Sequence, residues 1–177
     1  MTIHKIKINR APVLTLWAVV VAERLGYDRD AALTLGKAVA GLNAQSKGQS
    51  LGIFKPREKL AEKEKERKKG EEFLVELLGR AVMVVRTEAG IRAAIKGRAT
   101  EPESVERYLR SKFGNALLDV QEAMRKLAAS RRPDDLAAQA YALYEQFRPE
   151  IPAGTKGWGA QDDLDLDRIA SLGRRNR

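Results

Sequence analysis

The chain has 177 residues, 44% of them apolar, which is enough to bury one substantial core. Cysteine is absent and His4 is the only histidine, which excludes disulfides, thiolate zinc sites and cysteine nucleophiles and leaves no basis for imidazole metal sites or His-dependent triads. The net charge of +9 is uneven, with +11 over residues 1–132 and −6 over residues 133–167, and a basic body of this kind attracts nucleic acid, an acidic protein or an anionic membrane surface.

The N-terminal region predicts a strand and then a buried helix. Apolar residues alternate over residues 3–8, and Pro12 suits the first turn of a helix that runs to about Leu25. The longest apolar stretch, residues 12–22, is far shorter than the roughly 20 residues that cross a membrane. We therefore expect no membrane partner, and the absence of cysteine is compatible with a reducing cytoplasm.

A second helix is predicted directly after the first. Asp28 or Asp30 can cap its start, and its pattern continues to about Ala44. Gly36 and Ala40 place small residues one turn apart on it, which predicts close packing against a neighbouring helix.

The turn between these helices carries the main resemblance in the chain. The sequence Val-Ala-Glu-Arg-Leu-Gly at residues 21–26 resembles the first half of many bacterial helix-turn-helix motifs, and the resemblance covers about residues 17–40. It implies DNA binding. An ordinary helical hairpin is the alternative, because the first helix is apolar on nearly every face and Asp28 and Asp30 would repel phosphate. The wider N-terminal stretch is also similar to small bacterial proteins to which no function is assigned, and this second resemblance implies no activity.

The middle of the chain predicts a loop, a charged segment and a β-hairpin. Glycines indicate a loop over residues 45–56, and residues 55–69 hold eight basic and four acidic side chains, as in a solvated helix or a flexible connector. Valine-rich segments on either side of Gly79 predict a hairpin over residues 72–86, with helix as the competing interpretation for residues 71–78.

The second half of the chain predicts further helices. Their expected ranges are residues 87–96, 102–113, 116–129 and 133–147, followed by a loop over 149–163 and a short helix from 166. The predicted fold class is therefore mostly α, an α-helical bundle with a minor β-hairpin around residues 72–86. Its expected organisation is a helical core over 1–147, with a charged linker or helix at 55–70, and an extended loop with a short C-terminal helix over 148–177.

Two groups of basic residues are candidate nucleic-acid contacts. The predicted helices 87–96 and 102–113, with the hairpin as a possible wing, carry one group, and the N-terminal arm carries the other. The candidates are Arg92, Lys96, Arg98, Arg107, Arg110 and Lys112 in the first group and Lys5, Lys7 and Arg10 in the second. Solvated helix faces are the alternative explanation for the first group, because glutamates are interspersed with its basic residues.

No catalytic, cofactor or metal site is expected. Asp163, Asp165 and Asp167 alternate with leucines, but the glycine and glutamate of a calcium loop do not follow, and the aspartates suit a helix start instead. The glycine-rich phosphate loops are also absent. The sequence thus predicts a non-enzymatic nucleic-acid-binding protein. The alternative is a protein-interaction or scaffold module that forms a homo-oligomer through complementary basic and acidic surfaces.

Overall fold

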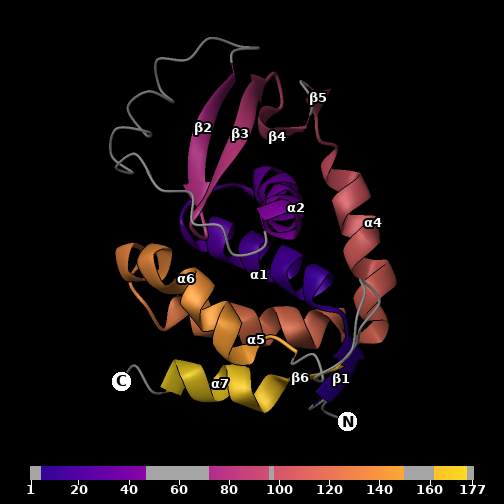
Figure 1. Ribbon diagram of the computed structural model, residues 1–177, viewed down its shortest axis with the longest axis vertical. Helices are drawn as coiled ribbons and strands as arrows, with labels where there is room; N and C mark the ends of the chain where they lie inside the picture. Colours follow the sequence, from indigo (N-terminus) through magenta and orange to yellow (C-terminus); the bar gives the residue numbers. More distant parts are fainter. Residues whose placement is uncertain (1–4, 47–71, 96–97, 150–161, 175–177) are drawn as a thin grey trace.

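A computed structural model describes residues 5–46, 72–95, 98–149 and 162–174 of this protein (Figure 1). The helices are α1 (Arg10–Arg24), α2 (Arg29–Ser46), α4 (Pro102–Phe113), α5 (Leu117–Ala129), α6 (Pro133–Phe147) and α7 (Leu166–Arg174), with a 3-10 turn, η1 (Gly114–Ala116), between α4 and α5. The strands are β1 (Lys5–Ile8), β2 (Glu72–Leu77), β3 (Arg80–Thr87), β4 (Gly90–Ile95), β5 (Arg98–Ala99) and β6 (Asp162–Asp165).

The strands form two antiparallel sheets at opposite ends of the molecule (Figure 1). Strands β2, β3, β4 and β5 follow one another in a four-stranded sheet, whereas β1 pairs with β6 from the other end of the chain. The β2–β3 connection is a two-residue turn in which Leu78 and Gly79 both have positive φ, 51° and 73°. A turn with positive φ at both positions matches the twist of the two paired strands. A leucine backbone rarely adopts positive φ, and the nearly complete burial of the Leu78 side chain stabilises it here.

Helix α1 is the centre of the core. Every residue from Pro12 to Ala22 is buried, because α2, α4, α5 and α6 all pack around the helix. Figure 1 shows α1 across the middle, with α2 and the four-stranded sheet on one side and α5, α6 and α7 on the other. The apolar residues on all faces of α1 therefore each have a neighbouring element to pack against.

The crossing of α1 and α2 depends on one glycine. A Cβ atom on Gly36 would lie 2.5 Å from Val19 Cγ2 and 2.6 Å from the Thr15 carbonyl oxygen. The two helices therefore approach more closely than any larger residue at position 36 would allow. The sequence-based prediction of close packing at Gly36 is confirmed, and Asp28 caps α2 by accepting a hydrogen bond from Ala31 N at 2.8 Å.

Aromatic side chains join α6 to α1. Trp17 is fully buried and its Nε1 donates to the Ala140 carbonyl oxygen at 2.8 Å. The Trp17 and Phe147 rings meet edge to face at 5.3 Å, and Phe147 also lies edge to face against Tyr144. The hydrogen bond to Ala140 satisfies the Trp17 indole N–H inside an otherwise apolar region.

The structure confirms a mostly helical fold and corrects its details. The predicted hairpin is present, but it belongs to a four-stranded sheet, so the molecule is not a pure helical bundle. The predicted helix over residues 87–96 is wrong, since this segment forms the end of β3 and then β4. A two-residue turn leads into Gly90, whose φ is 122°, and Ala93 N donates to Thr34 Oγ1 at 2.9 Å, so tertiary contacts override the helix propensity of the alanines.

Several other predictions can be placed. Strand β1 and the helices α1, α2, α4, α5, α6 and α7 lie where the sequence predicts them. The charged segment 55–69 and most of the loops predicted over 45–56 and 149–163 lie outside the described residues. Residues 162–174 pair with β1 through β6 and pack against α5 and α6 through α7.

Replacing Gly36 with alanine should destabilise the fold by about 1 to 3 kcal/mol, although alanine favours helix. The added methyl group would meet the Thr15 backbone, which cannot move without shifting α1. Gly41→Ala on the same helix is the matched control, because its Cβ would meet nothing within 4 Å, and it should stabilise by about 0.5 to 1 kcal/mol. Urea unfolding measures both, and equal effects of the two substitutions would contradict a tight crossing at Gly36.

Alkaline pH should destabilise the protein through Tyr144. Burial raises the pKa of Tyr144 to about 12, from its ordinary value of 10.0. Between about pH 10 and pH 12 the unfolded chain releases the phenol proton while the folded protein keeps it, so stability falls as the pH rises, by up to about 3 kcal/mol. Unfolding midpoints across this range measure the effect. Tyr144→Phe should lose this part of the slope, and an unchanged slope would contradict the assignment.

Candidate functional site

Two of the predicted nucleic-acid contacts have structural roles. The Arg92 side chain is only 8% exposed, and its Nη1 donates to the Ile91 carbonyl oxygen at 2.8 Å while its Nη2 lies 3.7 Å from Asp30 Oδ2. Arg10 Nε donates to the Pro149 carbonyl oxygen at 2.6 Å. Both side chains thus join separate segments of the chain.

The other two basic residues of the N-terminal arm lie beside acidic ones. The register of β1 and β6 places Lys5 opposite Asp165 and Lys7 opposite Asp163. Opposite charges at directly paired positions of an antiparallel sheet attract each other. The acidic segment therefore already meets the basic arm within one chain, and Asp165 Oδ1 also accepts from Asp167 N at 3.0 Å at the start of α7.

The register of α4 separates its basic residues. A helix turns by about 100° per residue, so Lys112 lies about 140° from Arg107 and about 160° from Arg110 around the axis. Arg107 and Arg110 are on the outward side, where Arg110 Nη2 lies 3.4 Å from Glu106 Oε1. Lys112 is on the opposite flank, with its Nζ 5.9 Å from the centre of the Tyr108 ring.

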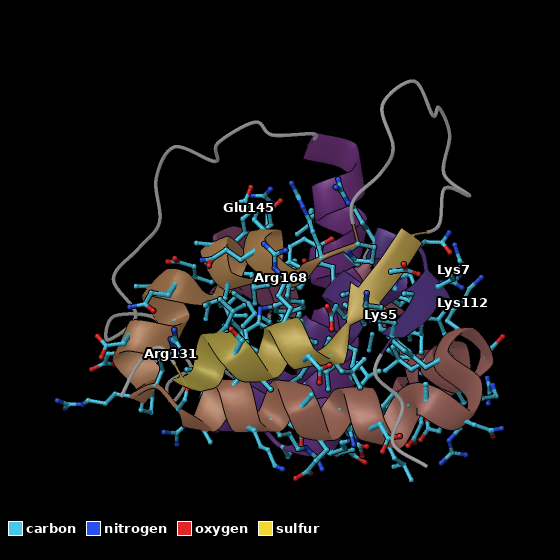
Figure 2. The ribbon with its side chains drawn as sticks, turned by 90° about the horizontal axis from the view of Figure 1, so that it is seen from below. Lys5, Lys7, Lys112, Arg131, Glu145 and Arg168 are labelled. Carbon is cyan, nitrogen blue, oxygen red and sulfur yellow. The ribbon has the colours of Figure 1, made fainter. Side chains whose placement is uncertain are left out.

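Lys112 lies near β1 instead. Figure 1 shows β1 beside the C-terminal end of α4, and Figure 2 shows Lys7 and Lys112 at the same edge of the molecule. Of the remaining candidates, Arg98 is exposed on β5 and Lys96 lies outside the described residues. The eight predicted contacts that the structure describes thus do not form a single surface.

The segment that resembles a helix-turn-helix motif is largely enclosed. Residues 31–36 of α2 are all buried, and α2 packs against α1, α4, β3 and β4. At its start, Arg29 Nη1 donates to Glu23 Oε1 and to Gln121 Oε1, each at 3.0 Å. The Arg29 side chain is thus used in contacts within the chain.

The described ranges contain no group of three or more His, Cys, Asp or Glu side chains that could hold a metal ion. Within the same ranges, no helix is both long and apolar enough to cross a membrane.

A groove of about 700 Å³ lies among α1, α2, α4 and the four-stranded sheet. Most of its described lining residues are apolar, and α1, α2, α4 and the sheet each contribute some of them. The lining residues are Ala11 and Thr15 of α1, Lys37, Ala38, Ala40, Gly41 and Leu42 of α2, Leu74, Ala81, Val82, Met83 and Ala94 of the sheet, and Ser104, Val105 and Tyr108 of α4. A concave, mostly apolar site of this size is typical of small-molecule binding.

Exposed apolar side chains concentrate at this groove. Leu74 is 40% exposed and Met83 is 38% exposed, and the two are directly paired across β2 and β3. Among the described residues, Leu118 on α5 is the third large hydrophobic residue that is exposed. Neighbouring exposed apolar residues that line a concavity mark a binding site more strongly than a single exposed leucine does.

Two polar groups border the groove from α2 and α4, which pack against each other. Lys37 is exposed and makes no hydrogen bond or ion pair with any described residue. Tyr108 is half-buried, and burial raises the pKa of its phenol above the ordinary value of 10.0, so the hydroxyl stays protonated at neutral pH. The Tyr108 hydroxyl likewise has no hydrogen-bond partner in the described part of the chain.

Sequence reasoning did not identify this groove. The sequence predicts only packing at Gly36 and Ala40, and Ala40, which is half-buried against the core, also lines the groove. Leu74 and Met83 occupy positions at which an antiparallel sheet with one face in solvent would carry polar residues. That departure from alternation is a signal that the hairpin sequence does contain.

Comparisons with protein-family models, with curated proteins and with solved structures found no match to this chain. Its function therefore has to be inferred from its own geometry.

Proposed function

We propose that this protein binds a small apolar ligand in the groove among α1, α2, α4 and the sheet. The observation that carries the proposal is the exposed Leu74–Met83 pair lining a concavity of about 700 Å³. Covering apolar surface contributes about 25 cal/mol per Å², so a ligand that covers this pair and the alanines beside it gains affinity from the hydrophobic effect.

The arrangement suits binding without chemistry. The groove lining includes one cationic residue, Lys37, and the hydroxyl groups of Thr15, Ser104 and Tyr108. Thr15 Oγ1 already donates to the Ala11 carbonyl oxygen at 2.9 Å, and Ser104 Oγ donates to the Glu101 carbonyl oxygen at 2.8 Å. Among the described lining residues there is no histidine, cysteine or carboxylate to act as a nucleophile or a general base.

Met83→Glu should weaken binding of the neutral fluorescent probe N-phenyl-1-naphthylamine by about tenfold or more, because it places a charge against the apolar body of the probe. Leu118→Glu is the matched control, since Leu118 is 74% exposed and does not line the groove, and its affinity should equal that of the unchanged protein. Saturable binding with one site per chain, measured by fluorescence titration, is the expected baseline.

Two results would contradict this proposal. Equal affinities of the Met83→Glu and Leu118→Glu variants would mean that the probe binds elsewhere. A dimer in sedimentation experiments that Met83→Glu converts to monomer, together with no probe binding, would assign the groove to a second copy of the chain. Such a dimer would differ from the homo-oligomer predicted from the sequence, which forms through complementary basic and acidic surfaces.

A second candidate function is nucleic-acid binding by the outward side of α4. Arg107 is exposed and makes no hydrogen bond or ion pair with the residues that the structure describes, and Arg110 is 70% exposed. The two lie one turn apart, so both guanidinium groups can reach one phosphate backbone. The net charge of +9 supports the approach of a polyanion.

Replacing both Arg107 and Arg110 with alanine should weaken binding to duplex DNA and reduce the slope of log K against log salt by up to about 2, because fewer counterions are released. Replacing Arg125 and Lys126 on α5 removes the same charge from another surface and should change the slope less. Electrophoretic mobility or anisotropy across a salt series measures both. Equal losses would show that only the net charge matters, and no loss would remove the α4 surface from consideration.

A further inference from the structure

The polar rim of the groove restricts the chemistry of its ligand. Of the residues that line it, Lys37 is charged and positive, and no carboxylate is among the described lining residues. An apolar ligand with a cationic head group would bring two like charges together, whereas a neutral ligand would leave the Lys37 ammonium without a partner.

Two donors are available for one head group. Lys37 on α2 and Tyr108 on α4 border the same groove, and neither has a hydrogen-bond partner among the described residues. The ammonium and the phenol O–H both donate to an anion, and charge-assisted hydrogen bonds of this kind are stronger than neutral ones.

The surroundings add positive charge on the α4 side. Lys112 Nζ lies 5.9 Å from the centre of the Tyr108 ring. Ser104, Tyr108 and Lys112 are spaced one turn apart, so they follow one flank of α4 from the groove toward β1. An anion at Tyr108 would therefore have a second cationic side chain, Lys112, nearby.

We infer that the ligand of this groove is an amphipathic carboxylate, with its apolar body against Leu74 and Met83 and its carboxylate accepting hydrogen bonds from Lys37 and Tyr108. This inference rests on the proposed function. Two donors match the two oxygens of a carboxylate. A phosphate monoester carries a third terminal oxygen and more negative charge than these two donors can satisfy.

The test compares ligands that share one alkyl chain. Dodecanoate, dodecanol, dodecyl phosphate and dodecyltrimethylammonium, each below its micelle concentration, are titrated against the protein loaded with N-phenyl-1-naphthylamine. The affinity of dodecanoate, measured by displacement of the probe, should be about tenfold higher than that of dodecanol, as expected for one charge-assisted hydrogen bond. Dodecyltrimethylammonium should have the lowest affinity of the four. The advantage of dodecanoate should disappear when acid protonates its carboxylate.

Variants then assign the head-group contacts. Lys37→Met should remove most of the advantage of dodecanoate while leaving dodecanol unchanged, and Tyr108→Phe should remove part of it. Lys126→Met is the matched control, because Lys126 is an exposed lysine of α5 outside the groove, and it should change neither affinity.

The outcomes separate the two proposals. If dodecanol binds as tightly as dodecanoate and Met83→Glu weakens both, the carboxylate inference is overturned and the apolar groove remains. Tighter binding of dodecyl phosphate than of dodecanoate would also overturn it. If the probe binds and Met83→Glu weakens it but none of the four compounds displaces it, only the carboxylate inference fails. If the probe does not bind, both proposals fail.

Discussion

The burial of α1 from Pro12 to Ala22 is the constraint on which the rest of the structure depends. A helix that is apolar on every face cannot lie at a surface, so it has to be enclosed by other elements. Helices α2, α4, α5 and α6 do so, and each is held to α1 by a specific contact or a complementary apolar face. At Gly36, α2 comes so close to α1 that a Cβ atom would lie 2.6 Å from the Thr15 carbonyl oxygen, and the fully buried Trp17 indole is satisfied by the α6 backbone. The layers on both sides of α1 follow from this requirement.

Two of the described arginines, Arg24 and Arg131, help to close that shell. Arg24 Nη2 donates to the Arg131 carbonyl oxygen at 2.9 Å just beyond the C-terminal end of α5, and Arg131 Nη1 donates to the Leu172 carbonyl oxygen at 3.2 Å in α7. Carbonyl groups at helix ends have no partner within the helix, and a guanidinium is well suited to supply one. Part of the positive net charge therefore comes from arginines that make contacts within the chain. The net charge alone overstates the number of basic side chains that are available to bind nucleic acid.

The same residues explain what sequence reasoning could predict. Local patterns are sufficient for α1, α2, α4, α5, α6 and α7, because each has helical spacing and a start or stop residue, and for the hairpin around Gly79, which has β-branched residues on both sides of a turn. They fail at β4, where the alanines favour helix but pairing with β3 and the Thr34 contact decide the conformation. They also fail for the candidate site. No local pattern encodes the contacts between distant segments. These contacts place Lys7 opposite Asp163 and bring Tyr108 and Lys37 to the same groove.

Helix α2 divides into two parts with different roles, and this division bears on function. Its first half, with Leu33 and Leu35 fully buried, is held between α1 and the sheet, while Ala38, Ala40 and Gly41 of its second half line the groove. Small side chains on a helix that is anchored elsewhere leave space beside its backbone. If the proposed ligand binds there, this side of the groove is already formed, so binding loses little backbone conformational entropy. Substitutions in the second half or on the exposed sheet positions can then change binding while the crossing at Gly36 continues to determine stability.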